Sequence, residues 1–129
     1  IKPIIEFYYK DDQLDDPFIN EEHIYFLQLA KPEEISELKA QALAINEILT
    51  ELFAKVGLVL VDFNLEFGRS NGQILLADEV TPDTCRLWDE RTNEHMDKDV
   101  YRRDLGDLIP VYQEVYNRLS ELTEEKERV

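Results

Sequence analysis

The most regular pattern of apolar and polar positions lies between Lys31 and Gly57. Apolar residues recur there every three or four positions, which places them along one side of a helix. Pro32 is tolerated in a first turn, and Glu33 and Glu34 favour the positive end of the helix dipole. Gly57 can adopt the left-handed conformation that ends many helices. The pattern therefore predicts one long amphipathic helix, with a buried stripe of Ile35, Leu38, Ala42, Ile45, Leu49, Leu52 and Val56.

A strongly apolar segment follows at residues 58–68. It begins as a continuous apolar run and then alternates between apolar and polar residues, which is typical of a β-strand. In a strand this alternation places Asp62, Asn64 and Glu66 on one face and the apolar residues on the other. The segment therefore predicts a strand that carries polar chemistry on one side only.

The dipeptide Asn71–Gly72 is a strong signal for a β-hairpin turn. We expect the chain to return as a second strand over Gln73–Val80. A two-residue turn would put Glu66 opposite Ala77, with Asp78 facing away. A metal ion shared by Glu66 and Asp78 therefore requires an odd-length loop or a bulge, and the sequence leaves this register open.

Shorter elements are expected before the long helix. Residues 4–9 are aromatic and β-branched, which predicts a strand. Residues 10–17 are dense in carboxylates and end in a proline, so they are expected to form a loop. Asn20 is a good N-cap for a short helix that contains Glu21, Glu22 and His23.

The C-terminal part is expected to be mainly helical. Residues 86–89 are assigned to a loop, and Asp97 or Asp99 can cap a short helix. A last amphipathic helix is expected to fray into the charged tail 121–129. Its apolar positions are Val111, Val115 and Leu119. The predicted fold is α+β, an antiparallel hairpin sheet packed with helices in a single domain over residues 1–129.

Composition narrows the classes of function. The 129 residues are 43% hydrophobic, which suits one domain with a core. The 14 basic and 29 acidic residues give a net charge of -15, so we expect neither nucleic acid nor a membrane surface as a partner. Apolar runs are shorter than the ~20 residues that span a bilayer. Cys85 is the single cysteine and cannot form an internal disulfide, which favours a cytoplasmic location.

The polar face of the predicted central strand has two interpretations. Asp62, Asn64 and Glu66 can simply be solvated, as one face of an antiparallel sheet often is. They can also belong to a site for Mg²⁺ and phosphate, because hard cations prefer carboxylate oxygens. His23 and His95 lack metal-ligand spacing, and we expect both to face solvent.

Four segments resemble a known family in the same order and spacing. Residues 61–68 are similar to a signature that reads hydrophobic-Asp-x-Lys-hydrophobic-Glu-Phe-Gly, and this signature is typical of SAICAR synthetases. The family name stands for the phosphoribosylaminoimidazole-succinocarboxamide synthases. The other similar segments are Phe7–Asp12 with Asp15–Pro17, Asp78–Asp89, and Met96–Asp99 with Arg102.

This resemblance implies a fold and an activity. The fold would be the C-terminal lobe of the ATP-grasp-like SAICAR synthetase fold, and the family's N-terminal ATP-binding lobe would be absent from this chain. The activity would be an ATP-dependent ligase of de novo purine biosynthesis. The family joins L-aspartate to carboxyaminoimidazole ribonucleotide and forms SAICAR, ADP and phosphate. These small molecules are the implied partners, a homo-oligomer is possible, and the chain alone is expected to be inactive.

The resemblance also assigns binding residues by position. Glu66 and Asp78 match the positions where the family binds the Mg²⁺ that accompanies ATP. Arg86 and Arg102 match the positions that hold the phosphate of the ribonucleotide. The chemistry is suitable, because a guanidinium group can bind two phosphate oxygens at once.

Three further residues match active-site positions of the family. They are Lys10, Asp16 and Asp62. A carboxylate is a poor acyl donor, so the family's reaction is expected to begin with phosphoryl transfer from ATP. Catalysis would then depend on positioning and on neutralisation of negative charge. We expect these residues to be catalytic without assigning a step to any of them.

Asn64 departs from the family pattern, so functions other than the ligase remain as alternatives. Asn64 stands where the signature has lysine, so the charge of an ammonium group is missing. With the net charge of -15 and the missing lobe, this leaves a non-catalytic acidic ligand- or protein-interaction domain as an alternative. A kinase-like phosphotransferase is a third reading, although it leaves residues 86–89 unexplained.

Overall fold

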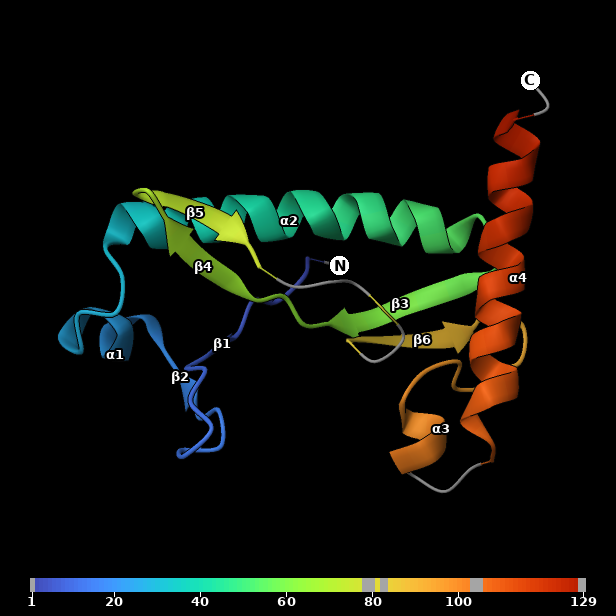
Figure 1. Ribbon diagram of the computed structural model, residues 1–129, viewed down its shortest axis with the longest axis horizontal. Helices are drawn as coiled ribbons and strands as arrows, with labels where there is room; N and C mark the ends of the chain where they lie inside the picture. The colour runs from blue at the N-terminus through green and yellow to red at the C-terminus, as the bar shows by residue number, and fades with distance from the viewer. Residues whose placement is uncertain (1, 78–80, 82–83, 103–105, 128–129) are drawn as a thin grey trace.

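The computed structural model describes residues 2–77, 81, 84–102 and 106–127, without the side chains of 101–102 and 124–127. Its elements in chain order are β1 (Phe7–Tyr8), β2 (Phe18–Ile19), α1 (Glu21–Phe26), α2 (Pro32–Ala54), β3 (Leu58–Phe63), β4 (Phe67–Ser70), β5 (Gln73–Leu76), β6 (Cys85–Asp89), α3 (Asp99–Arg102) and α4 (Leu108–Glu127). Figure 1 shows α2 along the length of the molecule beside β3–β6, with α1 at one end and α3 and α4 at the other.

The predicted long helix is confirmed as α2. The N–H group of Lys31 donates to the Glu34 carboxylate at 3.0 Å, which satisfies a backbone donor at the start of the helix. Beyond the last turn Gly57 has a φ of 74°, a conformation that favours glycine. The apolar side of α2 lies against β3 and β5 and buries Ile35 and Phe53.

Residues 86–89, assigned above to a loop, instead belong to β6. This strand pairs antiparallel with β3, beginning with Asp89 opposite Leu58. Its alternating residues Cys85 and Leu87 point into the core. The prediction of a loop was wrong because the strand is short and its partner lies much earlier in the chain, so the local pattern gives little sign of the pairing.

The single strand predicted over residues 58–68 is interrupted at 64–66. β3 ends at Phe63, and β4 begins a separate hairpin with β5. The predicted Asn71–Gly72 turn is confirmed, since both residues have positive φ, 51° and 77°. β5 ends at Leu76, and residues 78–80 of the expected return strand lie outside the described residues.

An ion pair joins this hairpin to the start of α2. Arg69 of β4 donates from Nε and Nη2 to the two carboxylate oxygens of Glu34, at 2.6 and 2.8 Å. This hydrogen bonding is the main reason why the pKa of Glu34 lies below its usual value. The hairpin is therefore held to α2 by a two-point contact as well as by packing.

The N-terminal segment has less strand than expected. The strand predicted over residues 4–9 is reduced to β1, which pairs with the unpredicted strand β2. The predicted cap of α1 is confirmed, because the side chain of Asn20 accepts a hydrogen bond from the N–H group of His23 at 2.9 Å. The Nδ1 atom of His23 accepts in return from the N–H group of Asn20 at 3.1 Å.

The core lies where α2, the β3–β6 pair and α4 meet. Partly buried apolar residues of these elements pack against it, among them Leu49, Leu60 and Leu119. The six buried residues at its centre are Phe53, Leu58, Cys85, Leu87, Met96 and Val115.

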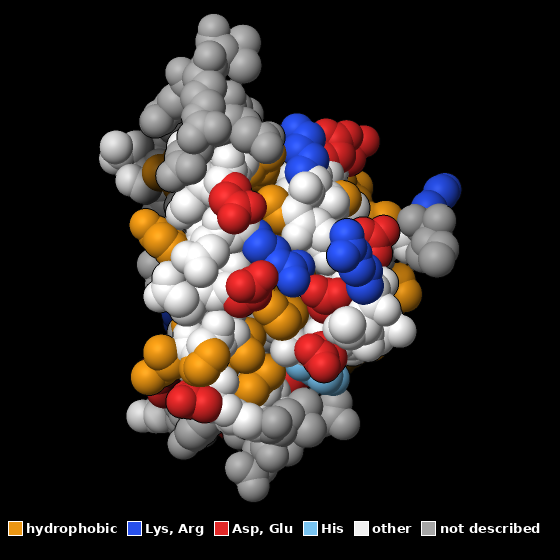
Figure 2. Space-filling model, turned by 90° about the vertical axis from the view of Figure 1, so that its right-hand side faces the viewer, with side chains coloured by type: hydrophobic (Ala, Val, Ile, Leu, Met, Phe, Trp, Pro, Cys, Tyr) orange, Lys and Arg blue, Asp and Glu red, His pale blue; other side chains and the backbone are white. Residues whose placement is uncertain are grey.

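The last helix is longer than predicted. Residues 121–127, expected to fray, continue α4. Figure 2 shows the face of the molecule at this end, where basic side chains lie beside acidic ones, so this face is not uniformly negative. Among the described residues, no helix is both long and apolar enough to cross a membrane.

Arg118 joins α4 to the end of β6 and to the segment that follows α2. Its Nη2 atom donates to Asp89 Oδ2 at 2.8 Å, Nε donates to Glu114 at 2.9 Å, and Nη1 donates to the carbonyl of Val56 at 3.2 Å. The other oxygen of Asp89 accepts from the N–H groups of Arg91 and Thr92. The hydrogen bond from Arg118 is the largest of the effects that lower the pKa of Asp89 from 3.8 to about 2.

This depressed pKa predicts an acid-sensitive contribution to stability. A carboxyl group whose folded pKa is lowered stabilises the fold above its unfolded pKa and loses that effect as pH falls through the folded value. We expect Asp89→Asn to lower the free energy of unfolding at pH 7, and the difference from wild type to shrink between about pH 4 and about pH 2. Urea unfolding followed by Trp88 fluorescence measures it. A difference that stays constant with pH would contradict the assignment, and Glu114→Gln, at a more exposed partner of Arg118, is the matched control.

Candidate functional site

A β-bulge in β3 decides which side chains face one another. The register shifts just before Asp62, which leaves Val61 as the extra residue and pairs Asp62 with Arg86. Residues directly opposite in an antiparallel pair point to the same face, so the bulge brings these two side chains together. An unbroken register would pair Asp62 with Cys85, whose side chain is buried in the core.

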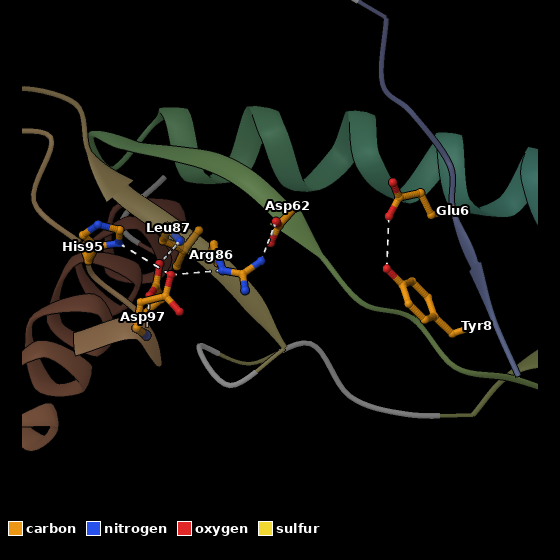
Figure 3. Close-up of polar contacts among 8 residues, drawn as sticks. Glu6, Tyr8, Asp62, Arg86, Leu87, His95 and Asp97 are labelled. Atoms are coloured by element: carbon orange, nitrogen blue, oxygen red, sulfur yellow. Dashed lines mark hydrogen bonds and ion pairs between the residues drawn. The ribbon is translucent and has the colours of Figure 1, made fainter. Parts of the chain in front are cut away.

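The guanidinium group of Arg86 lies between two carboxylates (Figure 3). Nη1 donates to Asp62 at 2.7 Å, and Nε donates to Asp99 at 3.0 Å. The pKa of Arg86 is raised, first of all by the hydrogen bond to Asp62, so the group is a cation. Within the described part of the chain Nη2 has no hydrogen-bond partner, and this edge of the group can bind an anion.

Asp97 holds the segment before α3 against β6. Its side chain is 0% exposed. One carboxylate oxygen accepts from the N–H group of Leu87 at 2.6 Å and the other from the N–H group of Asp99 at 2.8 Å. Figure 3 shows this carboxylate beside Leu87, close to Arg86. Because a buried charge is costly unless hydrogen bonded, both bonds are needed to keep Asp97 in place.

Glu66 lies in the interruption between β3 and β4 and contacts the N-terminal segment. Its carboxylate accepts from the ammonium group of Lys10 at 2.5 Å, across 56 positions of sequence. Both side chains are partly exposed. A carboxylate that already holds one cation at an accessible position suits Mg²⁺, which prefers oxygen ligands. The environment of Glu66 therefore fits the metal role that the resemblance implies for it.

Asp16 shapes the loop that carries Lys10. Its Oδ1 atom accepts from the N–H group of Asp11 at 2.8 Å, and the φ angles of Asp15 and Asp16 are 58° and 45°. Such left-handed conformations are tolerated by aspartate better than by most residues. Among the described residues, the hydrogen bond of the Asp16 side chain is therefore within its own loop and not with Arg86.

Two candidate residues cannot be placed. Asp78 lies outside the described residues, and only the backbone of Arg102, at the end of α3, is described. The backbone N–H group of Ala77 donates to the carbonyl of Glu66 at 2.8 Å, as a two-residue hairpin turn requires. Asn64, which replaces the family lysine, is exposed, and its backbone N–H group donates to Thr84.

His95 and Asp99 also contribute to the site, although the sequence did not predict this. His95 is only 17% exposed and packs edge-on against Trp88, so the expectation that it faces solvent was wrong, whereas His23 is exposed. Ligand atoms of His95, Asp97 and Asp99 lie within 4.8 Å of one another. Both carboxylates are already engaged, Asp97 by backbone N–H groups and Asp99 by Arg86, so the group serves to build the site. The acidic–basic–acidic sequence at residues 97–99, close to a histidine, is the signal that could have revealed this group.

The chain matches a known protein family over most of its length. The family model described as SAICAR synthetase matches residues 1–119. A phosphoribosylaminoimidazole-succinocarboxamide synthase of Enterococcus faecalis is 62% identical over 120 residues, which are 92% of this chain and 51% of that protein. The chain thus spans about half the length of the curated relatives it matches.

Solved structures agree in fold. A SAICAR synthetase in complex with ADP superposes with a TM-score of 0.88 at 51% identity, covering 93% of this chain and 52% of that one. The SAICAR synthetase of Pyrococcus horikoshii OT3 gives a TM-score of 0.88 at 50% identity over 93% of this chain and 52% of its own. The predicted α+β fold is confirmed by these neighbours, and on sequence and structure together the chain belongs to the SAICAR synthetase family.

Proposed function

We propose that this protein is an ATP-dependent ligase that joins L-aspartate to carboxyaminoimidazole ribonucleotide, forming SAICAR, ADP and phosphate. The observation that carries the proposal is 62% identity to a synthase of that name over nearly the whole chain. The cationic Arg86 on an exposed face supports it, because this reaction needs a phosphate-binding group. We further propose that this chain forms the C-terminal lobe of a two-lobed enzyme, since it spans 51% of that relative.

Binding of the ribonucleotide would centre on Arg86. Its Nε and Nη1 atoms are engaged by carboxylates, and the Nη2 edge is directed to the ligand in this proposal. Arg102 would add a second cation. The overall charge of -15 does not prevent this, because a local guanidinium group outweighs distant charges that salt screens.

Binding of ATP would centre on Glu66 and Lys10. A solved relative with 51% identity binds ADP, which supports a nucleotide site in this protein. Glu66 would hold Mg²⁺, and Asp78 would share the ion if the chain departs from the regular hairpin register beyond Ala77, which lies opposite Glu66. The ion when bound neutralises negative charge on the phosphates. Lys10, which pairs with Glu66 here, would then be released to contact a phosphate oxygen. Asp16 would keep the Lys10 loop in shape.

The chemical route follows from the poor reactivity of a carboxylate. In the proposed first step a carboxylate oxygen of the ribonucleotide bonds to the γ-phosphorus of ATP, and ADP leaves. The amine of aspartate then bonds to the acyl carbon, phosphate leaves, and the nitrogen loses a proton. Asp62, exposed beside Arg86, is in our proposal the carboxylate nearest to this second step. We assign the reaction to the cytoplasm, which suits the reduced thiol of Cys85, and expect a homo-oligomer from the family resemblance.

A product assay tests the function directly. With ATP, Mg²⁺, the ribonucleotide and aspartate, we expect SAICAR, ADP and phosphate in equal amounts. Arg86→Ala should raise the KM for the ribonucleotide roughly 10- to 100-fold, because a hydrogen-bonded charge pair is lost. The exposed Arg91→Ala is the matched control. A phosphorylated acceptor formed without aspartate would favour a kinase, and binding without turnover would favour a non-catalytic domain.

The metal role of Glu66 has its own measurement. We expect Glu66→Gln to weaken Mn²⁺ binding in the presence of ADP by roughly tenfold or more, because a charged oxygen ligand is lost. Electron paramagnetic resonance counts free Mn²⁺ without any turnover. Glu37→Gln, an exposed glutamate on α2, should leave the binding unchanged. Equal Mn²⁺ affinity in wild type and Glu66→Gln would exclude Glu66 as a ligand.

Replacing Asn64 with lysine is expected to increase the activity. Asn64→Lys restores the cation of the family signature at an exposed position close in sequence to Glu66. We expect kcat/KM for ATP to rise roughly three- to tenfold, since an added charge-assisted contact favours the transferring phosphoryl group. Asn117→Lys on α4 adds the same charge elsewhere and should have no effect. An unchanged or lower kcat/KM in Asn64→Lys would show that asparagine is fully adapted to this site.

A further inference from the structure

Two carboxylates bind Arg86, and they are anchored very differently. Asp62 on β3 is 54% exposed and pairs with an arginine that is itself 38% exposed. Such an exposed ion pair holds a side chain weakly, because water and salt compete for both charges. Asp99 is only 12% exposed, and its bond to Arg86 Nε is partly buried. Asp99 is therefore the carboxylate that sets the position of the guanidinium group.

The backbone around Asp99 is attached to β6 at several points. The N–H group of Met96 donates to the carbonyl of Leu87 at 2.7 Å, and the fully buried Asp97 accepts from the N–H groups of Leu87 and Asp99. One residue further, Trp88 bridges to His95. Since Leu87 is the neighbour of Arg86 in β6, the segment that carries Asp99 is fixed to the strand that carries the arginine.

Arg86 bonds to Asp99 through Nε, which leaves the Nη2 edge available for a ligand. Because the guanidinium group is planar, a hydrogen bond from Nε–H restrains the direction of the whole group, and here that bond goes to the less exposed of the two carboxylates. With Nε bound by Asp99, the Nη2 edge keeps one direction whether or not Asp62 stays in contact. An arginine held in this way loses less conformational entropy when a ligand binds.

The two carboxylates also differ in how they can respond to an anionic ligand. Asp62, Arg86 and Asp99 together carry one net negative charge, which opposes an anionic ligand. A phosphate that approaches the Nη2 edge can relieve this repulsion if the exposed Asp62 moves away. If the buried Asp99 left Arg86, its Oδ2 atom would exchange a 3.0 Å hydrogen bond for the longer 3.7 Å contact with His95 Nδ1. The Asp62 contact is thus the exchangeable one and the Asp99 contact is permanent.

We propose that Asp99 is a positioning residue that orients Arg86 for the phosphate of the ribonucleotide, while Asp62 yields its contact when that phosphate binds. The inference rests on the proposed function of Arg86 as the phosphate-binding group. Asp99 acts through Arg86 and does not itself touch the substrate. Asp97 supports it by fixing its backbone N–H group.

Proton exchange at Arg86 Nε tests the positioning without any turnover. In ¹⁵N-labelled protein the Nε–H signal of Arg86 is assigned by its loss in Arg86→Lys. We expect Asp99→Ala to speed its exchange with water by roughly tenfold or more and Asp99→Asn, which keeps the shape, to speed it less. Asp62→Asn should change it less than about twofold. The Nε–H groups of Arg69 and Arg118, bound to Glu34 and Glu114, are internal references. Unchanged exchange in both Asp99 variants would overturn the proposal.

Kinetics provide the second test. In the complete enzyme Asp99→Ala should raise the KM for the ribonucleotide roughly 10- to 100-fold while the KM for ATP stays within about twofold, and Asp99→Glu should recover part of the loss. Asp89→Ala is the matched control, because it removes a carboxylate from another arginine, Arg118, at the far end of β6. An unchanged KM for the ribonucleotide in Asp99→Ala would also overturn the proposal. If wild type does not turn over the ribonucleotide, the proposed function fails, and the exchange measurement still decides the role of Asp99.

Discussion

The buried carboxylate of Asp97 is the contact on which the arrangement of the site depends. It has no access to water, and its two oxygens accept backbone hydrogen bonds from β6 and from the start of α3. A carboxylate in this position stabilises the fold only while both bonds persist, because a buried charge without partners is strongly unfavourable. The same two bonds hold Asp99 at a fixed distance from β6. Strand β6 therefore contributes Leu87 to the core and, through Asp97, also holds Asp99 in position.

The bulge at Val61 is the second constraint, and it acts on the opposite strand. One extra residue reverses the facing of the strand beyond it, so an acidic side chain that would point into the core points to Arg86 instead. Strands β3 and β6 otherwise pair in regular register and bury apolar residues between α2 and α4. The half beyond the bulge still contributes Phe63 and Cys85 to the core, and it also places Asp62 opposite Arg86.

Local patterns predicted the elements that depend on local interactions. Helix α2 has a clear periodicity and a terminal Gly57, and the hairpin has its Asn71–Gly72 turn, so both were predictable from neighbouring residues. Strand β6 was not, because its pairing with β3 is made across the chain and the bulge exists only once the strands have met. Alternation at residues 64–66 looked like a strand because periodicity cannot tell paired from unpaired extended chain. Arg86 was found through family resemblance, whereas its partner Asp99 required the three-dimensional contacts.

The contact between Lys10 and Glu66 has a consequence for the order in which the site assembles. Its partners are 56 positions apart, whereas Arg86 and Asp99 are separated by 13. Closing the longer loop costs about 1 kcal/mol more in chain entropy, and the exposed ion pair at its end returns little of that. We therefore expect the Arg86–Asp99 contact to form together with the β3–β6 core, and the Lys10–Glu66 contact to form later and to open more readily. On this expectation the Arg86 side of the site opens only with the core of the fold, whereas the Lys10 side can open locally.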